Sequence, residues 1–373
     1  MSVTLTFEDA YYDSGYIYFF AYEVNGIFRI NLPDNSMEFL VSIKEYGKER
    51  RRLFGSVVCI DKKLYFAPLS ADDILIYDMV ENDYRLISID KEDYKGTDAK
   101  FYALCQYQNS LFFFPTHYPA ILKLDLLSGN IMYYKNWLGL LPDYYKNGMD
   151  YFRQSVCLRG ELIIAPLCYS DDILLFDLKN NKEELVHIAT ERDKEYGFSG
   201  IRSDVDGYWL SSLTGKELYK WDYQSSTIKK YLLDNKNKSQ EYSYVGLDYC
   251  GDKVIIRPAY ENDLVIFDCN NICFEKISSD EYRGYGEGNQ GASTVRALIK
   301  CGGKEFFLCP QNGKTYYKLV LVNDKTLITE CKVEFDRAIE SWRIAESLVN
   351  EHLVFENDFM NINAFINSLN GEK

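Results

Sequence analysis

Hydrophobic and polar residues alternate along most of the chain in short runs that recur at a nearly constant spacing. The stretch APLSADDILIYD at residues 67–78 returns almost unchanged as APLCYSDDILLFD at residues 165–177. In both copies an apolar run ends at a proline, and a second alternating run follows within a few residues. A period of two is typical of a β-strand with one buried face, so each stretch predicts two consecutive strands.

Aligning the chain on this proline gives seven copies, 46 to 52 residues apart. The anchor positions are Ala21, Pro68, Pro115, Pro166, Ser212, Pro258 and Pro310. The residues two and four places before every anchor are apolar, and a second alternating run starts about seven residues after it. An Asp or Asn ends this second run in six copies, which predicts a turn because its side chain can bond the next backbone amides.

Weaker alternating runs flank the two central strands in several copies. Four strands in each of seven copies predict an all-β fold, a seven-bladed β-propeller of four-stranded antiparallel blades. We expect a propeller domain over residues 1–333, with blades at about 3–44, 53–90, 100–137, 151–189, 197–233, 243–278 and 292–333. Since each copy supplies its own four strands, no N-terminal strand is expected to complete the last blade.

Residues 334–373 have a different pattern and predict a short α-helical C-terminal extension. Two groups of apolar residues have helical spacing, the first around Ile339 and Trp342 and the second around Phe359 and Phe365. An apolar helical face is normally buried, so we expect both helices to cap the propeller, with Trp342 and Phe365 largely buried against it. Docking of a partner is the alternative.

The repeat resembles that of the β-propeller superfamily over roughly residues 3–333. The blades are kelch-like, although they lack the double glycine of kelch blades, and Trp221-Asp222 has no GH element to complete a WD40 signature. DVDGYWLSS at residues 204–212 is similar to a blade of the two-component-regulator propellers, in which a D-x-x-G turn precedes an aromatic strand. The resemblance implies the fold and no particular activity, because propellers host many unrelated functions.

Composition narrows the kinds of partner. The chain has 42 Lys and Arg against 56 Asp and Glu, a net charge of −14, which argues against nucleic acid or an anionic membrane as partner. The first twenty residues do not resemble a signal peptide, and no apolar run is long enough to span a membrane. The ten cysteines form no CxxC pair and suit reduced, buried thiols. We therefore expect a cytoplasmic monomer.

The start of each innermost strand supplies the first candidate site. Fourteen residues before the anchors stand Phe7, Phe54, Phe101, Phe152, Phe198, Tyr244 and Arg296. The aromatic rings suit packing between blades. Arg296 breaks this pattern, and an unpaired buried charge is costly. We expect its guanidinium to point into the channel mouth and to bind a carboxylate or phosphate, with Arg153 and His117 in support.

The loops after the anchors open on the same face as these strand starts. They carry Tyr22, His117, Tyr118, Tyr169 and Tyr260. Tyrosine rings around a concave mouth suit a peptide or a sugar, and solvated loops with incidental aromatics are the alternative. The arginine run at 50–52 lies in a loop between blades and is expected to be solvated. The Asp pairs at 72–73 and 171–172 recur at equivalent loops, which indicates turn chemistry.

No cofactor, metal or nucleophile motif has the context it needs. Gly286, Gly288 and Gly291 fit G-x-G-x-x-G but lie between predicted strands, and the three His are in separate segments. The favoured function is a non-catalytic scaffold that binds a protein, peptide or glycan on the loop face. The alternative is a carbohydrate hydrolase or lyase in the mouth, which would need Asp9 and a second acid, such as Glu8 or Asp248, about 5–10 Å apart.

Overall fold

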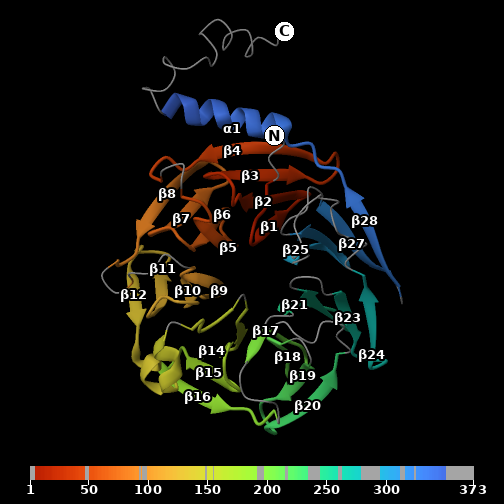
Figure 1. The fold of residues 1–373 in the computed structure, drawn as a ribbon. Coiled ribbons are helices and arrows are strands. Elements are labelled where there is room, and N and C mark those ends of the chain that lie inside the picture. The colour runs from red at the N-terminus through yellow and green to blue at the C-terminus, as the bar shows by residue number, and fades with distance from the viewer. Residues whose placement is uncertain are drawn as a thin grey trace, which may run out of the picture.

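Seven β-sheets are arranged in a ring around a central axis, and the chain passes through them in order (Figure 1). The computed structural model describes residues 5–46, 50–91, 94, 99–147, 149–153, 155–190, 197–214, 217–233, 244–258, 263–278, 295–310, 316–322 and 325–349. In the described part of the chain each sheet consists of four consecutive antiparallel strands. The predicted seven-bladed propeller is therefore confirmed. The last sheet is β25–β28, and no N-terminal strand completes it.

The first four blades are made of the following strands: β1 Ala10–Asp13, β2 Tyr16–Phe20, β3 Gly26–Asn31, β4 Ser36–Ser42; β5 Phe54–Ile60, β6 Lys63–Pro68, β7 Asp73–Asp78, β8 Asp83–Ser88; β9 Phe101–Tyr107, β10 Ser110–Pro115, β11 Ile121–Asp125, β12 Ile131–Tyr134; β13 Cys157–Arg159, β14 Leu162–Pro166, β15 Asp172–Asp177, β16 Lys182–His187. Two short 3₁₀ helices, η1 Asn136–Leu140 and η2 Asp143–Asn147, connect blades 3 and 4. The sequence pattern gave no sign of these two helices.

The last three blades are made of β17 Phe198–Ser203, β18 Tyr208–Ser212, β19 Glu217–Asp222, β20 Thr227–Leu232; β21 Tyr244–Cys250, β22 Lys253–Pro258, β23 Leu264–Asp268, β24 Cys273–Ile277; β25 Val295–Gly302, β26 Glu305–Pro310, β27 Tyr316–Val322, β28 Lys325–Cys331. The helix α1, Asp336–Val349, follows. It lies outside the ring along β4, the outermost strand of blade 1 (Figure 1).

The hydrophobic core lies between neighbouring sheets, because both faces of each middle strand are apolar. The ring of Phe20 from blade 1, for example, packs edge-on against Phe54 and Phe66 of blade 2. The six aromatic residues at the strand starts are all buried, from Phe7 to Tyr244. These rings fill the space between blades, as their recurrence suggests.

The polar turns between the third and fourth strands follow the predicted chemistry. Asp78 accepts the backbone amides of Val80 and Glu81 at 2.9 and 3.2 Å. The equivalent carboxylates Asp125, Asp177, Asp222 and Asp268 bond the amides two and three residues ahead in the same way. Short local bonds of this kind fix the turn without help from the rest of the fold.

The ring closes between blade 7 and blade 1. The hydroxyl of Tyr316 donates to the backbone oxygen of Leu5 at 2.5 Å, and its ring stacks with Phe7. After β28 the chain crosses to blade 1, where Glu334 pairs with Ser36 in a parallel bridge beside β4. α1 then buries Ala338 and Ile339 against the blade 1 core, and Trp342 is half-buried there. Phe365 and the second predicted helix lie outside the described residues.

Candidate functional site

The register of the last blade corrects the position predicted for Arg296. Pro310 pairs with Val295, just as Pro68 pairs with Phe54 in blade 2. The pairing of β25 with β26 contains one more irregularity than the equivalent pairings in blades 2, 3, 5 and 6, so counting fourteen residues back from the anchor stops one residue short. Val295 therefore occupies the aromatic position, where it is fully buried. Arg296 is the next residue.

The residue that follows the buried ring differs from blade to blade. In chain order they are Glu8, Gly55, Tyr102, Arg153, Ser199, Val245 and Arg296. Four of the seven carry a charge or a phenol. Packing does not require such groups at the start of an innermost strand, so these four form the frame of the candidate site. Together with Tyr22 and Arg52 they are called the mouth cluster below.

Glu8, Tyr22 and Arg296 form the first half of the mouth cluster. The Tyr22 hydroxyl donates to Glu8 Oε2 at 2.5 Å, and Arg296 Nη1 pairs with the same oxygen at 3.2 Å. The Arg296 guanidinium carbon also lies 4.6 Å from the centre of the Tyr22 ring. Burial works against the charge of Arg296, but the Glu8 carboxylate and Tyr22 more than compensate, so the pKa of this guanidinium is raised.

Arg52 is a member of the mouth cluster that the sequence did not reveal. Its Nη2 donates to the Tyr102 hydroxyl at 3.0 Å, and its guanidinium carbon lies 5.2 Å from the Tyr22 ring centre. Its backbone has φ +55°, a left-handed conformation that is rare and costly for a long side chain. Such strain is often found at functional positions. In the described part of the chain Arg52 forms no ion pair with a carboxylate.

Tyr102 lies where the charges of the mouth cluster meet. The pKa of Tyr102 is raised to about 12, mainly by burial and also by the nearby charge of Glu8, although Arg52, Arg153 and Arg296 act to lower it. The phenol therefore stays protonated at neutral pH. It accepts a hydrogen bond from Arg52, which leaves its own hydrogen available as a donor toward the mouth.

Arg153 and His117 are joined by a residue that the sequence reasoning missed. Asp150 accepts from Arg153 Nη2 at 2.5 Å and contacts His117 Nε2 at 2.9 Å. Burial would raise the pKa of Asp150, but His117 and Arg153 hold it below its usual range. Tyr169 lies close enough for its charge to affect the pKa of Arg153. The structure thus brings three of the predicted site residues together around one carboxylate.

The sequence also predicted Tyr118 and Tyr260 for the mouth. Tyr118 is fully buried in the core between blades 2 and 3, where its ring packs on Phe101 and its hydroxyl donates to the backbone oxygen of Asp90 at 2.8 Å. It cannot serve as a contact surface at the mouth. Tyr260 lies outside the described residues.

The carboxylate of Asp9 links two innermost strands. Its two oxygens accept the amides of Ala10 at 2.9 Å and of Val57 in blade 2 at 3.1 Å. Burial raises the pKa of Asp9 to about 6 in spite of these bonds. Ser155 makes the equivalent link between blades 4 and 5, because its hydroxyl accepts the amide of Ile201 at 2.8 Å. The shared pattern identifies Asp9 as a connection between blades.

A second set of charges lines the channel at blades 5 and 6. Asp248 pairs with Arg202 at 3.1 Å and with Arg257 at 3.2 Å, and Arg257 also donates to the backbone oxygen of Arg296 at 2.9 Å. Gly246 must lack a side chain, since a Cβ there would lie 2.5 Å from the Arg257 guanidinium. Asp248 is thus held between two arginines.

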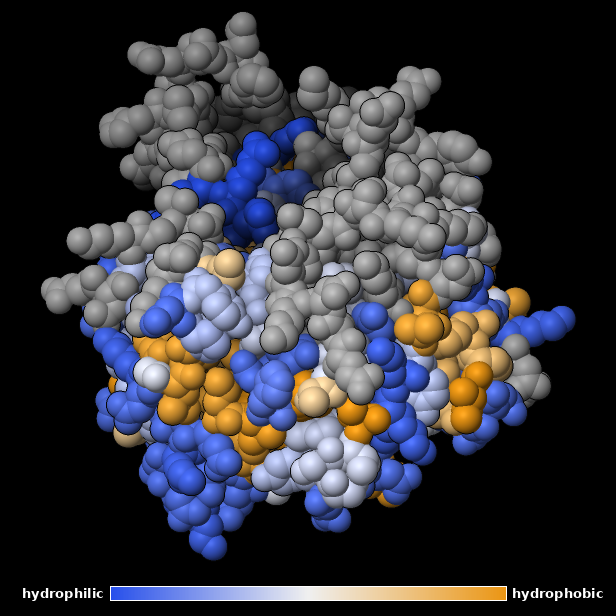
Figure 2. Space-filling model, turned by 60° about the horizontal axis from the view of Figure 1, so that its bottom comes forward, coloured by the Kyte–Doolittle hydropathy of each residue, from blue (hydrophilic) through white to orange (hydrophobic). Residues whose placement is uncertain are grey.

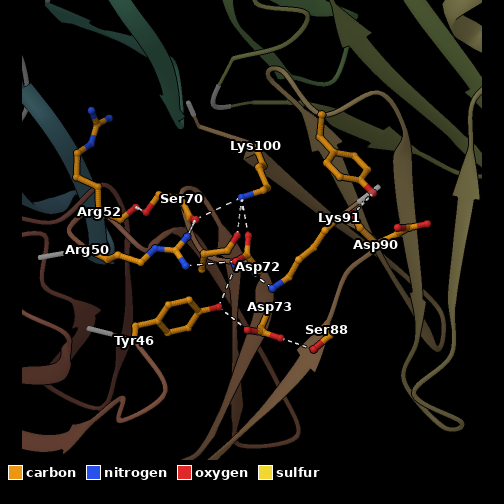
Figure 3. A network of polar contacts seen from close by, with 12 residues as sticks. Tyr46, Arg50, Arg52, Ser70, Asp72, Asp73, Ser88, Asp90, Lys91 and Lys100 are labelled. Atoms are coloured by element: carbon orange, nitrogen blue, oxygen red, sulfur yellow. Dashed lines mark hydrogen bonds and ion pairs between the residues drawn. The ribbon is translucent and has the colours of Figure 1, made fainter. Parts of the chain in front are cut away.

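A polar network centred on Asp72 adjoins the mouth cluster at the loop between β6 and β7 (Figure 3). Arg50, Lys91 and Lys100 reach its carboxylate at 3.2, 3.2 and 3.4 Å. Burial would raise the pKa of Asp72, but these three cations hold it low. Figure 3 shows Arg52 turned away from this network. The Asp pair of this loop therefore does more than form a turn.

Figure 2 shows a hollow in one face of the molecule whose described lining is strongly hydrophilic, in contrast to the mixed outer surface. A hollow with convergent guanidinium groups and phenols can bind an anion by charge-assisted hydrogen bonds. None of the helices described is long and apolar enough to cross a membrane.

Comparisons with known proteins support the propeller fold. No family model and no curated protein matches the chain. Among solved structures it is similar to the computationally designed protein Ika8, with a TM-score of 0.55 and 8% identity over 89% of both chains. It is also similar to the extracellular domain of the putative hybrid two-component system BT4673 from B. thetaiotaomicron, with a TM-score of 0.61 and 14% identity over 86% of this chain and 39% of that one. The WD40 repeats of RRP9 match with a TM-score of 0.57 and 10% identity over 84% and 90% of the two chains.

These identities are too low to transfer an activity, and they show the fold alone. The chain is a β-propeller. Its similarity extends to WD40 repeats and to a designed protein as well as to an extracellular domain, so a kelch-like subtype does not follow from it.

Proposed function

We propose that this propeller is a non-catalytic binding scaffold that presents its loop face to a protein or peptide and holds an anionic group of that ligand in the mouth cluster. One observation carries the proposal. Three guanidinium groups, from Arg52, Arg153 and Arg296, act on the same phenol, Tyr102. Arg52 among them has no carboxylate partner in the described part of the chain.

The electrostatic arrangement favours an anionic ligand. Arg52 and Arg296 both approach the ring of Tyr22, and the charge of Arg52 acts to lower the pKa of Arg296. Two like charges close together repel each other, although Tyr22 and the carboxylate of Glu8 outweigh this repulsion and the pKa of both guanidinium groups is raised. A ligand carboxylate or phosphate between them would relieve the repulsion.

A peptide suits the site better than a glycan. Sugar recognition usually relies on open aromatic faces, but Tyr22 and Tyr102 are buried and Tyr22 is covered by guanidinium groups. Tyr118 lies in the core. The accessible groups of the mouth cluster are therefore cationic and suit an acidic or phosphorylated segment.

The alternative of a hydrolase has less support. Both oxygens of Asp9 accept backbone amides, and Asp248 is paired with two arginines. A carboxylate engaged in this way is poorly placed to transfer a proton to or from a substrate. Glu8 is likewise occupied by Tyr22 and Arg296.

The finer expectations from the sequence belong to the same proposal. The D-x-x-G turn of the two-component-regulator type is supported by Asp204, whose Oδ1 accepts the amides of Asp206 and Gly207. A cytoplasmic location is supported by the ten free cysteines, which suit a reducing compartment. The fold itself does not decide the compartment, since the similar BT4673 domain is extracellular by its name. Another propeller neighbour comes from the Mitotic Checkpoint Complex, so this fold does occur in protein assemblies.

The test is the binding of a fluorescent hexaglutamate peptide to the full chain and to Arg52→Ala. We expect the variant to lose about ten- to a hundredfold in affinity, as for the loss of a charge-assisted hydrogen bond of roughly 1.5–3 kcal/mol. Arg52 is a cleaner choice than Arg296, because removing Arg296 would leave Glu8 without its ion pair.

Two further variants control this experiment. Arg85→Ala removes the same charge from the exposed face of β8 and should bind the peptide as the wild type does. Arg52→Gly also removes the side chain, so it should bind the peptide as weakly as Arg52→Ala does. Because glycine adopts a left-handed backbone without strain, Arg52→Gly should unfold at a higher denaturant concentration than Arg52→Ala. Wild-type affinity in Arg52→Ala would refute the proposal.

A further inference from the structure

Glu8 is the only member of the mouth cluster that is an acid, and it is buried among cations. Its side chain is 7% exposed, and its Oε2 contacts both the Tyr22 hydroxyl and Arg296. It occupies, in blade 1, the position that Tyr102, Arg153 and Arg296 occupy in their own blades. A carboxylate of the protein itself therefore already fills one of the places where a ligand anion could bind.

The charges of the described residues leave room for one further negative charge. Asp150 pairs with Arg153, Glu8 pairs with Arg296, and Glu23 also lies close enough to act on Arg296, so only the charge of Arg52 lacks a carboxylate contact in the described part of the chain. A ligand carboxylate would neutralise it. A phosphate monoester carries nearly two charges at neutral pH, so it would bring an excess of negative charge close to Glu8.

The donors still available also suit a carboxylate. Arg52 is an exposed residue, and the Tyr102 hydroxyl can donate because it accepts from Arg52. A planar carboxylate matches a guanidinium fork and one phenol, whereas a phosphate has three oxygens that seek donors. Arg296 could supply further donors, but its Nη1 is already paired with the Glu8 carboxylate.

We infer that the mouth cluster selects a carboxylate over a phosphate, and that Glu8 is the residue that sets this preference. The inference rests on the proposed function, because it names the class of anion that the same site accepts. The ligand is thus an acidic peptide segment that places a Glu or Asp side chain or a chain terminus between Arg52, Tyr102 and Arg153. Glu8 repels a second negative charge.

The experiment compares two capped pentapeptides that differ at one residue, Gly-Gly-Glu-Gly-Gly and the same peptide with phosphoserine in place of Glu. Affinities for the full chain are measured at pH 7.5. We expect the wild type to bind the Glu peptide at least tenfold more tightly than the phosphopeptide. In Glu8→Gln the phosphopeptide should gain at least tenfold, so that the preference disappears or reverses.

Glu38→Gln is the matched control, because it removes the same charge from the exposed strand β4 of the same blade and should leave the preference unchanged. If Glu8→Gln does not fold, the pH dependence of the two affinities can be measured on the wild type alone. Lowering the pH from 7.5 to 5.5 makes the phosphate mostly a monoanion, so the ratio of the two affinities should move toward one.

The outcomes separate this inference from the proposed function. If neither peptide, nor hexaglutamate, binds the wild type, the proposed function is wrong. If both pentapeptides bind and depend on Arg52, but Glu8→Gln leaves their ratio unchanged, the inference about Glu8 is wrong and the proposed function stands. Tighter binding of the phosphopeptide to the wild type at pH 7.5 would also overturn the inference.

Discussion

At the scale of single residues, the channel is held together by carboxylates with different roles. Glu8 and Asp150 balance arginines, whereas Asp9 accepts two backbone amides and joins blade 1 to blade 2. Of these three acids only Asp9 has a raised pKa, of about 6, because burial penalises its charge more than the two backbone amides favour it. The three acids are close in space, yet their partners give them separate functions.

The raised pKa of Asp9 predicts a pH dependence of stability. The folded state binds the proton more tightly than the unfolded state, in which the pKa is near 3.8. The stabilisation from this group is therefore complete below about pH 3.8 and is lost as the pH rises through about 6. Urea unfolding of the wild type and of Asp9→Asn between pH 4 and pH 7 should show the difference in unfolding free energy shrinking toward high pH.

The exposed residue Asp61, in the hairpin between β5 and β6, provides the control for this measurement. Asp61→Asn removes a carboxylate from the same region without changing the channel. The assigned pKa would be contradicted if the wild type and Asp9→Asn differed in unfolding free energy by the same amount at every pH in this range.

At the scale of the elements, α1 is attached to the propeller by both backbone and side chains. Met37 and Glu334 bond through their main chains at 3.1 Å just before the helix, and Ala338 and Ile339 are buried in the blade 1 core. An apolar helix face packed on an outermost strand covers surface that would otherwise face water. This arrangement matches the expected cap for the first predicted helix.

Truncation tests whether α1 is needed as a cap. A chain that ends after Phe335 should melt at a lower temperature than the full chain or lose solubility, because blade 1 is uncovered at β4. A chain that ends after Val349 keeps α1 and serves as the control, since the two truncations differ only in the helix. Equal melting temperatures of the two soluble truncations would assign α1 to a partner instead.

At the scale of the whole molecule, the closed ring depends on contacts between the two ends of the propeller. Tyr316 and Leu5 are 311 residues apart, and Arg296 and Glu8 are 288 residues apart, yet each pair is bonded. Contacts at such separation form only after the intervening chain has been ordered. The ring therefore closes where the mouth cluster lies, which links stability to the candidate site.

The closing hydrogen bond of Tyr316 can be removed without changing the packing of its ring. Tyr316→Phe leaves the buried backbone oxygen of Leu5 without this donor and should lower the unfolding free energy by about 1–3 kcal/mol. Tyr107→Phe is the control, because its hydroxyl bonds Glu161 at an exposed position and its loss should change little. Denaturant unfolding measures both, and an unchanged stability of Tyr316→Phe would mean that this bond does not hold the ring closed.

The sequence by itself determined the blades. Strand alternation and the Asp turns depend on residues that are close together in the chain. Because seven copies share the pattern, an error in assigning one blade is less probable than it would be for a single copy. The aromatic residues at the strand starts, such as Phe54 and Phe101, were identified for the same reason. The 3₁₀ helices η1 and η2 interrupt the repeat and carry no comparable periodic signal, so they were missed.

Only the tertiary structure decided the composition of the candidate site. One extra irregularity in the last blade moved Arg296 off the aromatic position, and such irregularities leave no periodic trace. The left-handed conformation that turns Arg52 toward Tyr102 is equally invisible in a loop of three arginines. Tyr118, in contrast, looked like a surface residue and is buried. Alternation along a strand is a local property, whereas contacts across a channel depend on how seven blades meet, which no single blade encodes.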